Sequence, residues 1–482
     1  MSTDNIYQTN DINAKRMSQR ALVLQGGVAL GAYEAGVIKT LSDKLMLEDE
    51  NNGITDRPIF DIVAGTSAGA INAAILVSYV KENGSWIGAA KVLEDFWMYL
   101  SESTPSIATF YGTWLGESAR RYYSSKYFFY EGLQNVFNGP QFTIDNKFHD
   151  YLPYFNNKLN VNPGTWFFYD NQPLKKSLEY EYEERKKFVR FPVTTSLDEG
   201  EPRLLTVAVD VQEAATVTFD SYEKRKDDTG NSVRQTTYGK PDKPITIKYN
   251  EGVKLEHVMA SASYPIYFKY QEIHGRQFWD GGILSNSPLR EVLQAHRDYW
   301  KNVRDEQPPD LDVYVINVWP GREVPAPTDY DGIKDRKNDI IYGDKNEYDQ
   351  KVAIMVGDYI DLFFKSEEIA FKYIPDQNKE AFTKAINSLL NGTDDQNPKS
   401  RKRSGVQRTY ADLLDKRFKL NKTITIERKD DPNNISDKWA DFSTETIKQL
   451  IRGGENYEDT AIIKIDTILQ REQGQTASYS HV

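Results

Sequence analysis

The sequence predicts an α/β fold with a mostly parallel central sheet, because apolar segments of strand length alternate with helical ones. The segment RALVLQGG is followed by GAYEAGVIKTLSDKL, in which Val37, Leu41 and Leu45 lie on one helical face. A second apolar segment, IFDIVAG, precedes AGAINAAILVSYV, a helix-like run of small residues. Parallel strands need crossover connections, which are usually helices, so this order favours a parallel sheet.

Shorter apolar runs predict the remaining elements. Strands are expected at RLLTVAVDVQ, TVTFDS, ITIKYN, RQFWD, DVYVINVWP and LNKTITIERK, and helices at 255–263 and 289–303. A long amphipathic helix is expected over 348–374. Residues 1–19 and 471–482 are polar, so we expect a disordered leader and a disordered tail.

Composition limits the possible functions. The net charge of −11 argues against nucleic acid as a partner and against a purely electrostatic attachment to anionic lipid. The chain has no cysteine, so it has no disulfide, no thiol nucleophile and no cysteine zinc site. The first twenty residues contain no apolar signal region, which predicts a cytoplasmic protein.

Aromatic residues are concentrated in one stretch. Residues 96–130 contain twelve aromatics in thirty-five positions, against 12% for the whole chain. The favoured interpretation is a satellite core under an inserted helical region of about 96–190. The alternative is a lid or a lipid-facing surface, because aromatic side chains favour the membrane interface.

The stretch DIVAGTSAGAINAAILVSYV permits two interpretations. From Ile62 it carries no charge for nineteen residues, which is long enough to span a bilayer. It also contains Gly65 and Gly69 around Ser67 in the G-x-S-x-G pattern of a serine nucleophile elbow. Its many Ala, Gly, Ser and Thr residues, with Asn72 in the middle, give little driving force for insertion. We therefore favour a buried elbow.

Two further motifs suggest what accompanies this serine. The loop QGGVALGAYEAG fits an oxyanion hole better than a dinucleotide fingerprint, because Val28 stands where the second fingerprint glycine is needed. In FWDGGILSNSPL, Asp280 ends a predicted strand at a glycine turn, although such turns are common. His257 is interpreted as a structural helix residue. The other histidines have polar, surface-like surroundings, so the base for Ser67 is expected to be a carboxylate; they are His149, His274, His296 and His481.

Taken together, the motifs LVLQGGVALGAYEAGV, VAGTSAGAINAA, ASASYPIYF and FWDGGILSNSPL resemble the patatin-like phospholipases. The resemblance covers roughly 21–289. The later stretches DIIYGDKNEYDQKVAIMVGDYI and DFSTETIKQLIRGG resemble the C-terminal part of longer prokaryotic members. The resemblance to this family implies a three-layer α/β/α fold, with a catalytic domain at 20–300 and a C-terminal α/β extension at 301–470 that packs on the core.

The resemblance also implies roles for individual residues. Ser67 matches the nucleophile and Asp280 its base, in a dyad without histidine. The amides of Gly26, Gly27 and Val28 match the oxyanion hole. The motif glycines with structural roles are Gly31, Gly65, Gly69, Gly281 and Gly282.

This chain departs from the family at two positions of the glycine loop. Val28 stands where the family has a third glycine, and Leu30 stands where it often has a basic residue. Valine resists positive φ, so we expect an altered loop and altered rate or selectivity.

The function implied is that of a serine lipid acyl hydrolase, which cleaves fatty acyl esters of phospholipids or related lipids through an acyl-enzyme. It uses no metal and no cofactor. Its expected partners are an acyl lipid substrate and, transiently, the membrane periphery, with no nucleic acid. The alternatives are a lysophospholipase, thioesterase or acyltransferase on the same dyad, and a non-catalytic lipid-binding scaffold. A nucleotide-binding enzyme is a more remote alternative.

Overall fold

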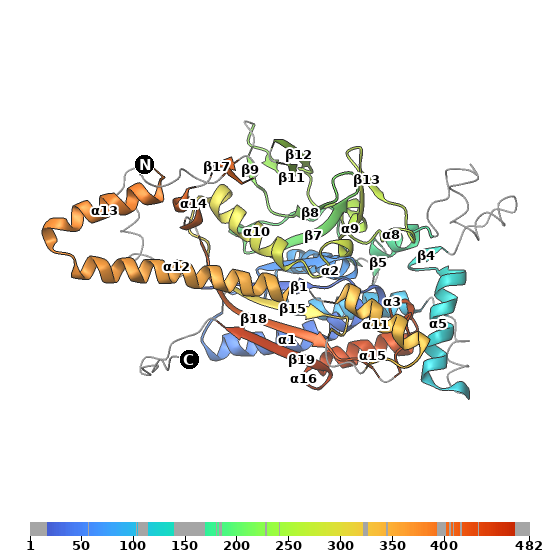
Figure 1. Ribbon diagram of the computed structural model, residues 1–482. Helices are drawn as coiled ribbons and strands as arrows, with labels where there is room; N and C mark the ends of the chain where they lie inside the picture. The colour runs from blue at the N-terminus through green and yellow to red at the C-terminus, as the bar shows by residue number, and fades with distance from the viewer. Residues whose placement is uncertain are drawn as a thin grey trace.

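The computed structural model confirms the α/β class and the mostly parallel sheet (Figure 1). The described residues are 17–55, 57–102, 104, 114–138, 169–179, 181–182, 186–226, 229–240, 242–321, 326–343, 346–392, 402–403, 406–407, 409–414, 417–431 and 433–467. Most of the predicted leader, the predicted tail, His149 and His481 therefore lie outside the described residues.

Nine strands of the described chain form the central sheet, in the order β13-β14-β7-β2-β1-β15-β18-β19, and β8 also pairs with β7. Neighbours from β7 to β18 along this order are parallel, whereas β8, β13, β14 and β19 pair antiparallel. The strands are β1 (Gln19–Leu24), β2 (Ile62–Thr66), β7 (Arg203–Asp210), β8 (Ala215–Asp220), β13 (Gln271–Ile273), β14 (Arg276–Asp280), β15 (Leu311–Asn317), β18 (Leu420–Arg428) and β19 (Ala461–Thr467).

Helices cover both faces of this sheet, which gives the three layers (Figure 1). Side chains of β1 alternate between the faces: Leu22 and Leu24 join the larger core, while Ala21 and Val23 join the smaller one. The larger core contains α1 (Ala32–Asn51), α2 (Ala68–Asn83), α3 (Ala89–Ser101), α9 (Leu255–Ser261) and α15 (Thr444–Glu455). The smaller core contains α10 (Leu289–Tyr299) and the start of α12 (Glu347–Tyr373).

Smaller elements complete the described chain. The hairpin of β11 and β12 is separate from the central sheet, so the predicted strand ITIKYN is not part of it. The predicted helix 289–303 ends as α10 at Tyr299 and continues as a π-helical turn. The other elements are α5 (Glu117–Glu131), α8 (Gln172–Leu178), α11 (Tyr330–Tyr342), α13 (Asp376–Leu390), α14 (Tyr410–Leu414), α16 (Tyr457–Thr460), β3 (Gly132–Leu133), β4 (Phe137–Asn138), β5 (Glu181–Tyr182), β6 (Lys186–Lys187), β9 (Arg225–Lys226), β10 (Ser232–Val233), β11 (Gln235–Lys240), β12 (Lys243–Lys248), β16 (Lys402–Arg403) and β17 (Val406–Gln407).

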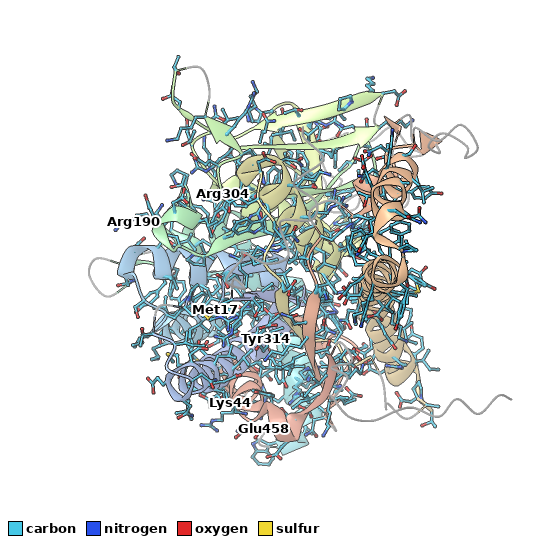
Figure 2. All side chains as sticks on the ribbon, turned by 90° about the vertical axis from the view of Figure 1, so that its left-hand side faces the viewer. Met17, Lys44, Arg190, Arg304, Tyr314 and Glu458 are labelled. Atoms are coloured by element: carbon cyan, nitrogen blue, oxygen red, sulfur yellow. The ribbon has the colours of Figure 1, made fainter. Side chains whose placement is uncertain are left out.

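The C-terminal region continues the same sheet and helical layer. Strands β18 and β19 extend the sheet beyond β15. Helices α1 and α15 touch backbone to backbone, because a Cβ on Gly36 would come within 1.9 Å of the Ile451 carbonyl oxygen. Lys44 and Glu458, labelled in Figure 2, form an ion pair between α1 and α16.

The uncharged stretch from Ile62 is not one helix, since it divides into β2 and α2. Among the described residues, no helix has the length and apolar character needed to cross a membrane. The bilayer interpretation of this stretch is therefore wrong.

Helices α12 and α13 form an arm that projects from the rest of the molecule, at the end opposite α5 (Figure 1). The long helix predicted over 348–374 corresponds to α12. Only the first part of α12 packs on the sheet, through Ala353 and Ile354. Viewed along the arm, both helices lie on one flank of the molecule (Figure 2).

Candidate active site

Ser67 lies on a sharp turn between β2 and α2. Its φ of 56° and ψ of −122° are rare for a residue with a side chain, and such strain is typical of functional sites. Strand and helix touch here: a Cβ on Gly65 would lie 2.1 Å from the Gly69 carbonyl oxygen, and one on Gly69 would lie 2.4 Å from that of Leu24. Glycine is therefore required at both positions, as the motif predicted.

A neighbouring helix holds the turn in place. The Ser67 amide donates to the Ser261 hydroxyl at 3.0 Å, and that hydroxyl donates to the Val207 carbonyl at 2.5 Å. Ser261 belongs to the ASASYPIYF motif, but the sequence did not reveal this supporting contact.

Asp280 comes next to Ser67 from the end of β14. The carboxyl group accepts the Gly282 amide at 2.7 Å, and the Ser67 side chain lies close enough to it to influence its pKa. It is only 2% exposed. Burial raises its pKa from 3.8 to about 7, while the Ser67 side chain and the Gly282 amide act in the opposite direction. A carboxyl group poised near neutral pH can accept a proton from a hydroxyl.

No histidine lies among the described residues that line the cavity around Ser67. His257 is buried, and its Nδ1 accepts the Lys254 amide at the start of α9, as expected of a structural residue. His296 was expected at the surface, and that prediction is wrong. It is fully buried, and its Nε2 lies 2.9 Å from the Pro309 carbonyl oxygen. Burial lowers the pKa of both rings to about 3, which leaves them neutral.

The glycine loop supplies backbone amides beside Ser67, but not all three that were predicted. The Gly26 amide donates to the Asn286 carbonyl at 3.1 Å, so it is not free for an oxyanion and this prediction is wrong. The amides of Gly27 and Val28 have no acceptor among the described residues. Both residues line the same cavity as Ser67 and Asp280. Of the three backbone donors predicted for the oxyanion, the amides of Gly27 and Val28 remain available.

Val28 keeps a left-handed backbone with a φ of 52° despite its branched side chain. We expected valine to resist this conformation and to alter the loop. The structure instead places valine in the region that glycine occupies without strain. The departure from the family at Val28 therefore strains the backbone locally and leaves the left-handed conformation in place.

Residues from well beyond the loop fix its position. The Trp319 indole donates to the Gly26 carbonyl at 2.8 Å, and the Gln25 side chain accepts the amides of Val318 and Trp319. The side-chain amides of Gln25 and Asn286 both donate to the Tyr342 carbonyl. Gln25 and Asn286 were within quoted motifs, but Trp319 and Tyr342 had no sequence signal that linked them to the loop.

A cavity of about 460 Å³ opens above Ser67. Aromatic side chains are the most numerous kind in its wall and join the large core, so the predicted satellite core is wrong. The members of the aromatic stretch that line it are the buried Phe96, Trp97 and Phe128 and the half-buried Phe129. Other members are exposed, in keeping with the alternative interpretation; they are Trp114, Tyr122, Tyr123 and Tyr130.

Three lysines also line this cavity, and besides Asp280 it has one further buried acid, Asp437. Asp437 accepts Lys126 at 3.1 Å and Lys334 at 2.9 Å. No ion-pair partner of Lys337 is seen within the described part of the chain. The polar part of the wall therefore carries a net positive charge.

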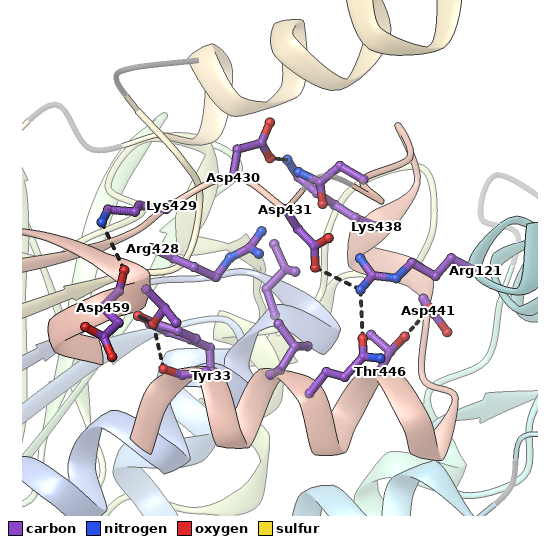
Figure 3. Close-up of a pocket in the computed structure, with 16 residues that line it drawn as sticks. Tyr33, Arg121, Arg428, Lys429, Asp430, Asp431, Lys438, Asp441, Thr446 and Asp459 are labelled. Atoms are coloured by element: carbon purple, nitrogen blue, oxygen red, sulfur yellow. Dashed lines mark hydrogen bonds and ion pairs between the residues drawn. The ribbon is translucent and has the colours of Figure 1, made fainter. Parts of the chain in front are cut away.

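A second, polar cavity of about 340 Å³ lies on the α1 side of the sheet (Figure 3). Leu30 and Tyr33, just after the glycine loop, form part of its wall. Arg428 extends toward its middle; its Nε donates to the Val318 carbonyl, and its buried Nη2 has no partner among the described residues. The positive charge in this cavity, beside Leu30, is therefore supplied by Arg428 at the end of β18.

Lys438 forms another side of this polar cavity. Its buried ammonium group lies 3.1 Å from Asp335, 2.7 Å from Asp339 and 3.6 Å from Asp430. These carboxylates could otherwise suit a cation. The lysine already supplies the positive charge between them.

The chain was also compared with known proteins. The crystal structure of VipD from Legionella pneumophila is similar at 14% identity with a TM-score of 0.29, over 90% of this chain and 67% of that one. No match was found among the curated proteins. The sequence matches the family model of patatin-like phospholipases over residues 22–293, which is more than half of its length. With the elbow, the glycine loop and the DGG turn all inside the matched region, the chain belongs to the patatin-like phospholipase family.

Proposed function

We propose that this protein is a serine lipid acyl hydrolase that cleaves fatty acyl esters of phospholipids through a Ser67–Asp280 dyad. The observation that supports it most is the buried Asp280 carboxyl, which lines the same cavity as Ser67 and has a pKa of about 7. Near neutral pH about half of such groups are ionised and can act as a base. The aromatic cavity beside the pair suits an acyl chain.

In the first step, Asp280 takes the hydroxyl proton of Ser67 as Oγ forms a bond to the ester carbonyl carbon. The amides of Gly27 and Val28 then donate to the tetrahedral oxyanion, with the positive end of α2 behind Ser67. The intermediate collapses when the carbon–oxygen bond to the alcohol breaks. Asp280 returns its proton to the departing alcohol, and the acyl group stays on Ser67.

In the second step, water replaces the alcohol. Asp280 accepts a proton from the water, whose oxygen attacks the acyl carbonyl through a second tetrahedral intermediate. The bond from carbon to Ser67 Oγ breaks, Oγ regains the proton from Asp280, and the fatty acid leaves. Every proton moves between the Asp280 carboxyl, the Ser67 hydroxyl, the departing alcohol and the attacking water.

The cavity's lysines favour a phospholipid over a neutral lipid. Lys337 has no ion pair within the described residues, and an ammonium group at the edge of an apolar cavity can bind a phosphate. Exposed apolar residues near the start of α5 could contact the membrane surface during catalysis; they include Trp114, Leu115 and Tyr122. Transient peripheral attachment is therefore part of the proposal.

Labelling with a fluorophosphonate tests the nucleophile. The wild type should be labelled once, on the peptide that contains Ser67, and Ser67→Ala should abolish labelling and ester hydrolysis. Loss of a nucleophile costs about 10⁴-fold or more in kcat. Ser42→Ala is the control, because this serine lies in α1 outside the cavity. Labelling that survives in Ser67→Ala, or a wild type that is never labelled, would contradict the proposal.

Mass spectrometry of products from a mixed lipid extract tests the substrate class. Free fatty acid and lysophospholipid should accumulate with the wild type and not with Ser67→Ala. Release from single-chain lipids alone would make the protein a lysophospholipase, and acyl transfer to an added alcohol or thiol in place of hydrolysis would make it an acyltransferase. Turnover of acyl thioesters alone would indicate a thioesterase. Each of these outcomes would replace the phospholipid assignment.

A further inference from the structure

The outer face of α12 carries a continuous apolar stripe. Its positions alternate in steps of four and three residues, which is the spacing of a coiled-coil seam. The eight positions are Tyr348, Val352, Met355, Tyr359, Leu362, Ser366, Ile369 and Tyr373. Apart from Val352 and the one serine, their side chains are 46 to 78% exposed. We call these eight positions the seam.

The contacts that α12 makes within the chain lie on its other side. Ala353 and Ile354 pack on the sheet, and Asp361 pairs with Lys419 at 2.6 Å. Phe371 contacts Phe382 of α13. On a helical wheel these positions fall opposite or beside the seam. No described residue covers the seam itself.

We propose that the seam pairs with the seam of a second copy of this chain, with the two helices antiparallel. In that orientation Tyr359 of one copy lies opposite Leu362 of the other, and successive layers extend outward from this central pair. The outermost layer joins Tyr348 to Tyr373. The symmetry axis falls within one residue of the middle of α12, so all eight positions find a partner.

Charges beside the seam agree with this register. Asp358 and Lys365 flank the central layers, and neither has an ion-pair partner among the described residues. Antiparallel pairing brings Asp358 of each copy toward Lys365 of the other, once on each side of the axis. It also brings Lys351 near Lys372. Lys351 is already paired with Glu347 at 2.7 Å, which reduces that repulsion.

The size of the seam is sufficient for a dimer. Taking roughly 200 Å² for a fully exposed aromatic side chain, the exposed seam amounts to on the order of 700 Å² per copy. The total for two copies then falls within the ~1,200–2,000 Å² that stable interfaces bury. Each globular part lies on the side of α12 away from the seam, so the two do not overlap.

A membrane is a poorer partner for this arm than a second copy. The arm projects from the end of the molecule opposite α5, which lies beside the proposed substrate cavity (Figure 1). In α12, six acidic residues outnumber three lysines, so the helix is repelled by anionic lipid. The proposal does not depend on the catalytic assignment.

Sedimentation velocity of the full chain tests the association. The wild type should sediment as a dimer of 55.4 kDa chains, and Tyr359→Glu combined with Leu362→Glu should give a monomer with unchanged thermal unfolding. Ile87→Glu is the matched control, because this side chain is equally exposed but distant from α12, and it should stay dimeric. A monomeric wild type, or a dimer that survives the seam substitutions, would overturn the proposal.

Charge reversal and cross-linking test the orientation. Asp358→Lys and Lys365→Asp should each weaken the dimer, and the two together should restore it. Because the chain has no native cysteine, Tyr348→Cys chains should cross-link only when mixed with Tyr373→Cys chains. Cross-linking of Tyr348→Cys chains to one another would indicate parallel helices and refute the register. Vesicle binding that is lost in the seam variant, with a monomeric wild type, would assign the seam to membranes.

Discussion

Replacing Asp280 by asparagine separates the catalytic role of this residue from its effect on stability. Asparagine preserves the side-chain shape and can still accept the Gly282 amide, which lies 2.7 Å from the carboxylate in the wild type. It cannot take a proton from Ser67. Since general-base assistance is worth about 10²–10⁴-fold, kcat/KM should fall by at least that range. The fold should be retained.

The raised pKa of Asp280 also predicts how stability changes with pH. Folding raises this pKa from 3.8 to about 7, so the group contributes stability below pH 3.8 that is lost as the pH rises through 7. Three pKa units correspond to on the order of 4 kcal/mol. Asp280→Asn does not titrate at this position, so its free energy of unfolding shows no such loss. Relative to the wild type, the variant should therefore become more stable between pH 4 and pH 8, by up to about that amount.

Two measurements on both proteins test this reasoning. Ester hydrolysis by the wild type should rise about tenfold per pH unit below pH 7 and then level off, because the ionised carboxylate is the active form. Urea unfolding at several pH values gives the stability difference. His257→Gln is the control, and its turnover should stay close to normal because the neutral ring moves no proton. A flat activity profile from pH 5 to 7, or an active Asp280→Asn, would refute the dyad.

Three further substitutions test the loop and the turn. Because φ at position 28 is 52°, Val28→Gly should be about 1 kcal/mol more stable to urea than Val28→Ala, which is the reverse of the order in a helix. Equal stability of the two variants would contradict the backbone strain inferred at this position. Trp319→Phe removes the hydrogen bond to Gly26 and should lower kcat about 2- to 12-fold with little change in KM; a KM effect alone would place the indole in substrate binding. Gly69→Ala should unfold the chain or lower its melting temperature strongly. Gly357→Ala is the control, because its added methyl group meets open space in α12, and it should raise the melting temperature slightly. Similar effects of both substitutions would show that the turn tolerates a Cβ.

Local motifs in the sequence predicted much of the central architecture. G-x-S-x-G placed Ser67 on a strand-to-helix turn, because Gly65 permits the close approach of β2 and α2, and Gly69 permits that of α2 and the end of β1. The DGG turn placed Asp280 at a strand end. Each of these features is determined within a few residues, so its sequence is sufficient to reveal it.

Features that depend on distant residues were predicted less well. The Gly26 amide is occupied by Asn286, more than 250 residues away, and no local pattern indicates that contact. His296 looked exposed because its sequence neighbours are polar, yet Phe418 and the Pro309 carbonyl enclose it. Helical spacing predicted α12, but only the tertiary structure shows which of its faces the sheet covers.

The anchoring of the glycine loop has a consequence for the order in which the protein is synthesised. While the ribosome has released only the first three hundred residues, β1 still lacks its neighbour β15, and no indole holds the Gly26 carbonyl. The loop reaches its final geometry only after Trp319 and Tyr342 have emerged. A nascent chain therefore carries the proposed nucleophile and base well before it has a fixed oxyanion site. The hydrolase activity proposed above would therefore stay latent until most of the chain has been translated.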